Sequence, residues 1–325
     1  MRSITITVPP ERENATVKSI LRREAHMADV QISRLKLRED GIRLNGKRVF
    51  TNARVRPGDV ISVRISDTDR RNEAAPVEAP LDIVYEDEDI IVLNKSPDMA
   101  VHGTTGGNGC TVANAMAFRY GADQAFHPVN RLDRGTSGLM VIAKSTYVHD
   151  QLRKMLHTED FRREYIAVAQ GIVTPSRGEI KLPIGKDPDH PTKRTVTPSG
   201  QPAHTGYRVM SCGEDCTVLR LRPFTGRTHQ LRVHMAAIGH PLLGDALYGN
   251  GITEKWRRPA LHSAFLHLRQ PVTGEMLELE APLPPDIADN LFKYVTGFSG
   301  IPGYRKKHPA GNPCADTADG ADGLF

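Results

Sequence analysis

The stretch Asn130-Arg131-Leu132-Asp133-Arg134-Gly135-Thr136-Ser137-Gly138-Leu139 is the most unusual segment of this 325-residue chain. It places one carboxylate between two arginines, in a loop of Gly, Thr and Ser that leads into an apolar run. Surface ion pairs of this kind are common and contribute little to stability. The same surroundings also keep a carboxylate ionised, as a nucleophile or a base requires. Physical chemistry alone therefore leaves two interpretations of Asp133 open, an exposed salt bridge and a catalytic group.

The residues around this loop predict a globular α+β domain over residues 81–300. Some short stretches are continuously apolar or alternate, as strands do, and in others apolar residues recur at helical spacing. Strands are predicted at residues 81–85, 90–93, 138–143, 164–170 and 217–221, and helices at residues 111–120, 147–156 and 229–238. Because strands and helices do not alternate regularly, the pattern disfavours a doubly wound parallel sheet and predicts a mixed or antiparallel one.

The positive charge of the chain is concentrated at its N-terminal end. The formal net charge is +5 and the pI is about 9.0. Residues 1–70 hold 15 Lys and Arg against 9 Asp and Glu, so they carry +6 and the other residues carry −1. This asymmetry indicates a separate basic module with a polyanionic partner, and a solvated basic face without a partner is the alternative. Residues 71–80 are polar and rich in Ala and Pro, which predicts a linker, and the composition of residues 301–325 predicts a disordered tail.

The pattern within residues 1–70 predicts a small α/β domain. Its expected elements are a strand at residues 3–8, helices at residues 15–26 and 32–39, a hairpin around Asn45-Gly46 and a strand at residues 60–65. This order resembles the S4 RNA-binding domain over residues 13–66. The resemblance implies that the second helix and the hairpin face RNA, whose phosphates basic side chains would contact. Those side chains are Arg34, Lys36, Arg38, Arg43, Lys47 and Arg48.

The loop that contains Asp133 resembles the signature of RluA-type pseudouridine synthases, which usually reads H-R-L-D-x-x-T-S-G-L. Asn130 replaces the usual histidine, and the other defined positions match. Further motifs follow in the family's order, so the resemblance spans about residues 81–287. They are Y-E-D at 85–87, V-L-N-K at 92–95, G-C-T-V-A-N-A at 109–115, R-E-Y-I-A at 163–167, T-G-R-T-H-Q-L-R-V-H at 225–234, G-H-P-L-L-G-D at 239–245 and H-S at 262–263.

The resemblance implies three catalytic residues. In the family the motif aspartate is catalytic, and it maps onto Asp133. Tyr165 would pack its ring on a uracil taken out of the base stack, and its hydroxyl would accept a proton or a hydrogen bond when C5 is deprotonated. Arg227 would hold the carboxylate of Asp133 with its guanidinium fork. Arg131 would help to fill the space left by the flipped nucleotide.

Each of these roles has a simpler alternative. Tyr165 could be an ordinary core tyrosine, Arg227 could contact a phosphate, and Arg131 could be an exposed loop residue. Three further polar residues of the T-G-R-T-H-Q-L-R-V-H motif are expected to make structural hydrogen bonds rather than to catalyse. They are His229, Gln230 and His234.

The sequence carries no signature of a metal or of a nucleotide cofactor. The segment Gly103–Gly109 lacks the Lys-Ser/Thr of a phosphate-binding loop, and no H-E-x-x-H motif exists. Pseudouridine formation involves no redox change, so no cofactor is expected. No long apolar run and no N-terminal apolar segment are present, and the four cysteines form no recognisable framework, which predicts a cytoplasmic protein without membrane contact. A monomer is expected.

The sequence thus predicts an RNA pseudouridine synthase that acts on specific uridines, in large-subunit ribosomal RNA first and in tRNA as the alternative. A non-catalytic RNA-binding protein on the same fold is a second hypothesis, and the joint presence of Asp133, Tyr165 and Arg227 disfavours it. A hydrolase or deaminase of nucleic acid is a third, and the missing metal signature disfavours that.

Overall fold

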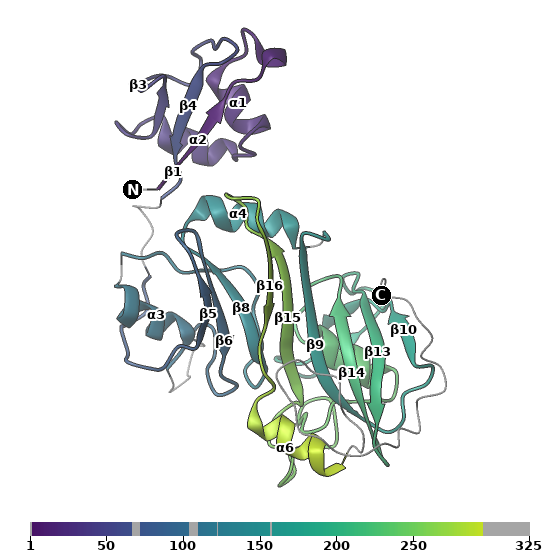
Figure 1. Cartoon of the computed structure of the whole chain (residues 1–325). Coiled ribbons are helices and arrows are strands. Elements are labelled where there is room, and N and C mark those ends of the chain that lie inside the picture. The colour runs from purple at the N-terminus through teal and green to yellow at the C-terminus, as the bar shows by residue number, and fades with distance from the viewer. Residues whose placement is uncertain (1, 67–71, 104–109, 122, 157, 295–325) are drawn as a thin grey trace.

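The computed structural model describes residues 2–66, 72–103, 110–121, 123–156 and 158–294 of the chain, and it shows two units (Figure 1). The first unit comprises residues 2–66 and the second comprises residues 72–294. The predicted boundary at residue 70 falls outside the described residues, as does the predicted tail at residues 301–325.

The N-terminal unit is a four-stranded antiparallel sheet with two short helices. Its strands pair in the order β1-β4-β2-β3. The elements are β1 (Ser3–Thr7), a 3-10 turn (Pro10–Arg12), α1 (Val17–Arg23), α2 (Asp29–Leu35), β2 (Ile42–Leu44), β3 (Lys47–Arg48) and β4 (Val60–Arg64). Asn45 and Gly46 both have positive φ values, 49° and 79°, as the predicted tight hairpin requires.

The two helices differ from their predicted bounds because side-chain capping and close packing set their ends. Thr16 accepts a hydrogen bond from Ser19 N, so α1 begins at Val17 rather than at residue 15. The second helix ends at Leu35 and not at residue 39. The chain folds back there, and a Cβ atom on Gly41 would lie 2.0 Å from Leu35 O.

The second unit is built on one mixed sheet of ten strands in the part of the chain that the structure describes. Their order is β10-β13-β14-β9-β15-β8-β6-β5, with β16 beside β15 and β7 beside β8. The strands are β5 (Ile83–Glu86), β6 (Ile90–Lys95), β7 (His127–Pro128), β8 (Ser137–Ala143), β9 (Phe161–Gln170), β10 (Arg177–Ile180), β13 (Thr205–Cys212), β14 (Cys216–Pro223), β15 (Leu261–Arg269) and β16 (Met276–Glu280). Only β8 and β15 pair in parallel, so the α+β class with a mixed sheet is confirmed.

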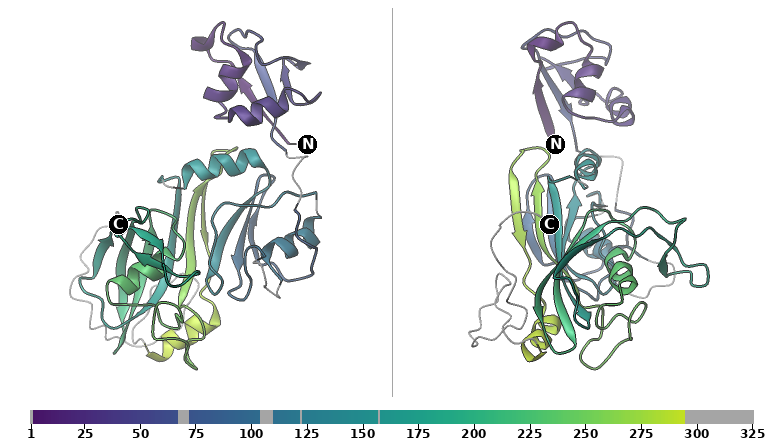
Figure 2. Two further views of the ribbon diagram at one scale, coloured as in Figure 1. Left: turned by 180° about the vertical axis from the view of Figure 1, so that it is seen from behind. Right: turned by 90° about the vertical axis from the view of Figure 1, so that its right-hand side faces the viewer.

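Helices cover both faces of this sheet. They are α3 (Val112–Tyr120), α4 (Thr146–Met155), α5 (Gln230–Ala237) and α6 (Pro285–Tyr294), and a small hairpin of β11 (Ile184–Lys186) and β12 (Arg194–Val196) lies beside α5. Figure 2 shows α3 and α5 on the same face. Strand β9 alternates between the faces, since Tyr165 and Ala167 pack in the cluster that includes α3 and α5, whereas Ile166 and Val168 pack against α6.

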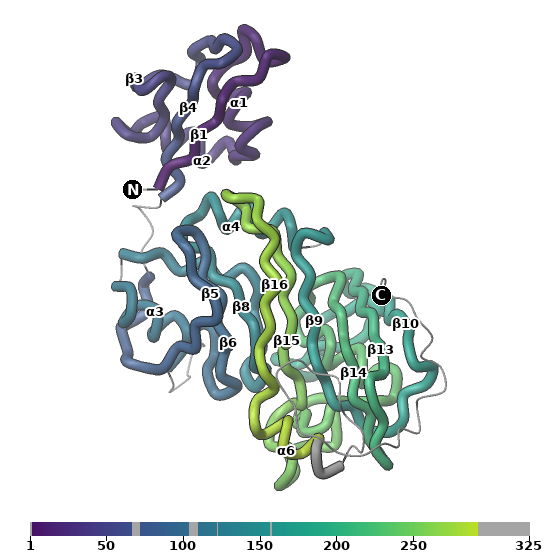
Figure 3. Tube along the Cα trace, viewed as in Figure 1, coloured from purple at the N-terminus to yellow at the C-terminus, as the bar shows by residue number. Residues whose placement is uncertain are grey.

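The parallel pair at the centre of the sheet brings distant segments together. Strand β15 lies between β8 and β9 (Figure 3), and Ser263 of β15 is opposite both Gly138 of β8 and Tyr165 of β9. A Cβ atom on Gly138 would lie 2.2 Å from Ser263 O, and its φ value is +108°, so only glycine fits here. The loop before β8 therefore ends two strands, or about 10 Å, from Tyr165.

The N-terminal unit is attached to α4 and to the turn between β5 and β6. Tyr147 donates a hydrogen bond to Ala25 O at 3.1 Å, and Lys154 donates one to His26 O at 2.6 Å. Arg2 forms two hydrogen bonds with the buried carboxylate of Asp89, at 3.0 and 3.1 Å. These contacts place the N-terminal unit beside α4 (Figure 1).

The described part of the predicted linker, residues 72–80, is bound to α3. The buried Asn72 side chain donates to Ala113 O at 2.7 Å, and the side chain of Asn114 donates to Ala75 O at 2.7 Å. The linker is therefore attached to the second unit, although its polar composition predicts a free connection.

Candidate active site

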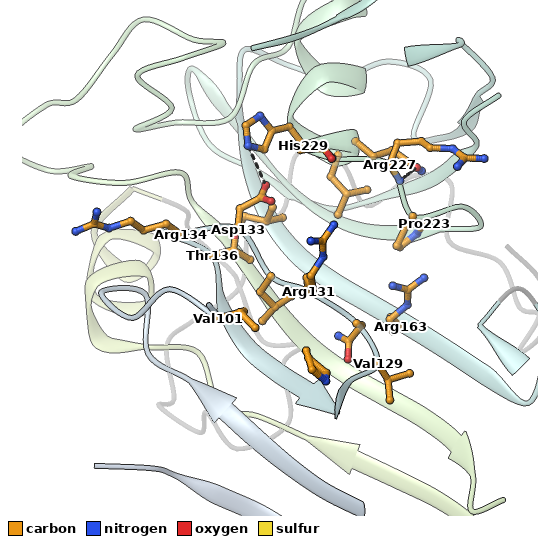
Figure 4. A pocket seen from close by; sticks show the side chains of 18 of the residues that line it. Val101, Val129, Arg131, Asp133, Arg134, Thr136, Arg163, Pro223, Arg227 and His229 are labelled. Carbon is orange, nitrogen blue, oxygen red and sulfur yellow. Dashed lines mark hydrogen bonds and ion pairs between the residues drawn. The ribbon is translucent and has the colours of Figure 1, made fainter. Parts of the chain in front are cut away.

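A pocket of about 920 Å³ opens where the loop before β8, strand β9, helix α4 and the turn before α5 meet (Figure 4). The described residues that line it include seven arginines and a single carboxylate, Asp133. The arginines are Arg131, Arg134, Arg153, Arg163, Arg194, Arg227 and Arg232. A cavity with this excess of positive charge attracts a polyanion and focuses it on one acidic group.

Hydrogen bonds to the backbone fix the loop that carries Asp133. Thr136 N donates to Asp133 O at 3.0 Å, Gly135 N donates to Pro97 O at 2.9 Å, and Arg258 donates to Gly135 O at 2.8 Å. Gly135 has a φ value of +89°, which glycine adopts without strain. The loop is therefore held from two sides, and the side chain of Asp133 stays partly exposed in the pocket.

Asn130, which replaces the usual motif histidine, ties the start of this loop to β8. The residue is buried, its amide oxygen accepts a hydrogen bond from Val141 N at 2.8 Å, and its amide nitrogen donates to Leu139 O at 3.4 Å. An asparagine supplies both the donor and the acceptor that this position needs. Asn130 thus anchors the start of the loop that carries Asp133.

The cation next to Asp133 is Arg232, on the first turn of α5. Its Nη1 lies 3.6 Å from Asp133 Oδ2, while its Nε and Nη2 donate to the two carboxylate oxygens of Asp245 at 2.7 and 2.8 Å. Asp245 is fully buried and also accepts hydrogen bonds from Leu247 N and Tyr248 N. Burial by itself lowers the pKa of Arg232. The hydrogen bonds and charge of Asp245 outweigh burial, with a further contribution from the charge of Asp133, so the pKa is raised above its ordinary value. Asp245 therefore positions a permanent cation against Asp133.

His229 approaches Asp133 as a neutral imidazole. Its Nε2 lies 4.0 Å from Asp133 Oδ2, and its Nδ1 lies 2.8 Å from the hydroxyl of Tyr248. Burial lowers the pKa of His229 more than Asp133 raises it, and Arg232 and Arg194 lower it further. Tyr248 also accepts a hydrogen bond from Arg194 N at 2.8 Å, so its hydroxyl links His229 to the backbone of β12.

The prediction that Arg227 holds Asp133 is wrong in this structure. Arg227 lines the pocket but is directed away from Asp133 (Figure 4). Its Nε donates to Pro202 O at 3.0 Å and its Nη1 donates to Gln201 Oε1 at 2.9 Å. The reason is the turn before α5, where Gln230 binds Arg227 N and Thr225 and thereby directs the first arginine of the motif outward. The second arginine, Arg232, faces the carboxylate instead.

The hydrogen-bonding roles predicted for Gln230 and His234 are confirmed, whereas His229 belongs to the site. Gln230 donates to His204 O at 2.9 Å, and His234 contacts Thr205 Oγ1 and Leu182 O, each at 2.9 Å. His229 has a left-handed backbone conformation, with a φ value of 57°, at the start of α5. This conformation is unusual for a residue with a side chain, and it lets His229 face the pocket.

Tyr165 lines the same pocket from β9, as predicted. Its side chain is buried, and burial raises the pKa of its hydroxyl, with Ser263 and Arg163 opposing this effect and Asp133 adding to it. Tyr165 is therefore a neutral phenol at neutral pH. It can donate or accept a hydrogen bond, but it is not deprotonated and so does not act as a phenolate base.

The basic residues predicted to bind RNA are found in two places. Arg131 lines the pocket and is exposed there. The other six lie in the N-terminal unit and are outside the pocket lining, and all of them are exposed except the half-buried Arg38. They are Arg34, Lys36, Arg38, Arg43, Lys47 and Arg48.

Sequence reasoning missed Arg232, Asp245 and Tyr248. Arg232 and Asp245 lie in the motifs at 225–234 and 239–245, and Tyr248 follows three residues after the second, yet a motif does not say which of its polar residues converge. Among the described residues no group of three or more His, Cys, Asp or Glu side chains is arranged to bind a metal ion. In the same part of the chain, no helix combines the length and the apolar character that a membrane crossing requires.

Comparisons with known proteins place this site in context. Residues 89–237 match the family model described as RNA pseudouridylate synthase. A protein of Pasteurella multocida named ribosomal large subunit pseudouridine synthase D is 43% identical, covering 80% of this chain and 86% of that protein. Its namesake in Vibrio cholerae is 44% identical, with the same coverage of both chains. Among solved structures, human RNA pseudouridylate synthase domain containing 1 has a TM-score of 0.54 and 26% identity, covering 66% of this chain and 88% of that one.

Proposed function

This chain belongs to the RNA pseudouridylate synthase family, and we propose that it isomerises uridine in large-subunit ribosomal RNA with Asp133 as the catalytic carboxylate. The observation that carries the proposal is the single carboxylate in a pocket lined by seven arginines, among the described residues. RNA supplies the negative charge that such a pocket attracts.

The reaction breaks the N1–C1′ bond of a uridine, turns the uracil and joins C5 to C1′. The proton on C5 leaves and N1 gains one, so the product is an isomer of the substrate and no redox partner is needed. A base inside a helix is out of reach of such chemistry, so the nucleotide is flipped into the pocket. Asp133 is the group that attacks or removes a proton there.

The surroundings of Asp133 suit this role. Arg232 lies 3.6 Å from the carboxylate and is itself fixed by Asp245, so a positioned cation faces Asp133 before substrate binds. The imidazole of His229 places its Nε2 4.0 Å from the same oxygen. Preorganised donors of this kind need no rearrangement at the moment of reaction.

Tyr165 is positioned to hold the flipped base. Its ring lies in the apolar cluster that forms the floor of the pocket, together with Leu132 and Leu231. A pyrimidine stacked on this ring would have the hydroxyl of Tyr165 near its edge. Because burial raises the pKa of this hydroxyl, we assign it a hydrogen-bonding role and not that of a resident phenolate.

The N-terminal unit supports a ribosomal RNA substrate. Its two helices, its hairpin and its final strand follow the order of the S4 RNA-binding domain. Its basic side chains at residues 34, 36, 43, 47 and 48 are exposed. The named relatives act on the large ribosomal subunit according to their names, and tRNA is the alternative substrate. An enzyme of ribosomal RNA works where ribosomes are, so we also propose a cytoplasmic location; the monomeric state stays a prediction.

Tritium release tests the proposal. Large-subunit ribosomal RNA and tRNA labelled with [5-³H]uridine are incubated separately with the protein, and the water fraction is counted. We expect release from the ribosomal RNA, and its loss by about 10⁴-fold or more in Asp133→Asn, since the nucleophile or base is removed. Asp189→Asn, which changes an exposed carboxylate outside the pocket lining, is the matched control. Release by Asp133→Asn at the wild-type rate would show that another group catalyses the reaction.

A further inference from the structure

Arg163 is a buried cation that faces the active-site pocket without a carboxylate partner. Its residue is 8% exposed, and it lines the pocket from β9. Its Nε makes no hydrogen bond, and none of the ion pairs among the described residues includes it. The ring of Phe161 packs beside it, with the ring centroid 5.8 Å from the guanidinium carbon.

The neighbouring arginines of the sheet are paired. Arg220 of β14 binds Glu164, and Arg222 binds Glu159 at 2.5 Å. Burying a charge without a partner is unfavourable by several kcal/mol, so buried charges are normally paired. In the part of the chain that the structure describes, Arg220 and Arg222 have carboxylate partners and Arg163 has none, which indicates that the counter-ion of Arg163 comes with a ligand.

The position of Arg163 relative to Tyr165 identifies that ligand. The two residues are two apart on β9, so their side chains lie on the same face of the sheet and about 7 Å apart along the strand. Arg131 and Arg163 are both directed into the pocket (Figure 4), and Arg153 of α4 lines the same cavity. A nucleotide whose base contacts Tyr165 carries its nearest anionic groups, the backbone phosphates, one sugar away.

We propose that Arg163 binds a backbone phosphate of the RNA strand next to the flipped uridine, with Arg131 and Arg153 on the outer side of the same strand. This inference rests on the proposed function for the identity of the bound base. The guanidinium fork matches two phosphate oxygens, and the dry surroundings of its Nε make the contact stronger than an exposed one. Arg163 acts by binding and takes no part in the chemical step.

The test compares Arg163→Met with Arg162→Met. Methionine has a similar length, is uncharged and packs well in an apolar site. Arg162 is the matched control, because it lies on the opposite face of β9 and outside the pocket lining. Retention of radiolabelled large-subunit ribosomal RNA on filters is measured for each protein between about 50 and 200 mM NaCl, a range over which phosphate contacts lose much of their affinity. Thermal unfolding of each free protein is measured in parallel.

We expect Arg163→Met to bind the RNA about 10-fold or more weakly and to reduce the slope of log affinity against log salt by about 0.7. Arg162→Met should change the affinity by less than about 3-fold. The midpoint of unfolding of Arg163→Met should equal or exceed that of the wild type, because an unpaired buried charge has been removed. Arg163→Lys should keep the salt slope, since it keeps the charge.

Three results would overturn the inference. They are an unchanged salt slope in Arg163→Met, a loss of binding in Arg163→Lys as large as in Arg163→Met, and a fall in the unfolding midpoint of Arg163→Met beyond that of Arg162→Met. The last would assign Arg163 a structural role. Filter retention measures binding and needs no turnover. If the wild type failed to release tritium, the proposed function would be contradicted, but the comparison of RNA binding by Arg163→Met and Arg162→Met would still test the role of Arg163.

Discussion

Replacing Arg232 by Gln separates the two arginines of the T-G-R-T-H-Q-L-R-V-H motif. The substitution removes the cation 3.6 Å from Asp133 Oδ2 and both hydrogen bonds to Asp245. Arg227→Gln, by contrast, removes hydrogen bonds to Pro202 O and Gln201 and leaves Asp133 with its partners. Both variants replace an arginine by a glutamine, so each is the control for the other.

The structure sets the size of both effects. At 3.6 Å and an effective dielectric constant of about 20, a unit charge pair interacts by about 4 to 5 kcal/mol. The side chain of Asp133 is 27% exposed, which screens part of this, so we expect Arg232→Gln to lower the rate of the chemical step by at least about 30-fold. Asp245 is fully buried and loses its cation, which destabilises the fold by about 3 to 5 kcal/mol and lowers the midpoint of unfolding by about 6 to 20 °C.

Single-turnover tritium release at saturating enzyme measures the chemical step, and differential scanning calorimetry measures the midpoint. Both variants are compared at a temperature at which circular dichroism shows that they are folded. Arg227→Gln should retain the rate within about 10-fold and unfold within about 3 °C of the wild type, because its hydrogen bonds are partly exposed. A larger loss of rate in Arg227→Gln than in Arg232→Gln would refute the assignment of Arg232 as the partner of Asp133.

Two further predictions concern acid stability and the N-terminal unit. Burial lowers the pKa of His262 to about 4, below the ordinary value of 6.5. As the pH falls, the imidazole is therefore protonated in the unfolded chain before it is protonated in the folded one. The free energy of unfolding accordingly decreases between pH 6.5 and 4. In denaturant titrations, the free energy of unfolding of His262→Gln should therefore decrease by about 3 kcal/mol less than that of the wild type over this pH range. Equal decreases in the two proteins would contradict the lowered pKa. Changing Arg43, Lys47 and Arg48 together to Ser should weaken binding of large-subunit ribosomal RNA and reduce its salt slope by about 2 to 3, without changing the single-turnover rate at saturation. An unchanged slope would argue against an RNA-binding role of the hairpin.

Much of the fold follows from local patterns. The Asn45-Gly46 hairpin, the helix that begins after Thr111 and the apolar run of β8 each depend on residues that are close in sequence, and they are found where they were expected. Turn chemistry, capping and alternation act over a few residues, so they can be read without the tertiary structure. The strands β13 and β15 were not foreseen as such, because their polar and apolar residues do not alternate cleanly.

The centre of the site can also be predicted from motifs. Asp133 and Tyr165 belong to recognisable motifs, and the structure places both in one pocket. Gly138 is required because β8 and β15 approach so closely that a Cβ atom would overlap Ser263 O. Asp133, Gly138 and Tyr165 lie in contiguous motifs and can be recognised along the chain, although the close approach that requires Gly138 is itself a tertiary contact.

The groups that surround Asp133 are set by contacts between distant parts of the chain. Arg227 and Arg232 lie in one motif, and nothing in their spacing says which of them faces a carboxylate some hundred residues earlier in the chain. The direction of each guanidinium depends on the left-handed turn at His229, on the buried carboxylate of Asp245 and on the docking of α5 against the sheet. A charge pair forms where two side chains meet in space, and that meeting is set by packing across the whole domain.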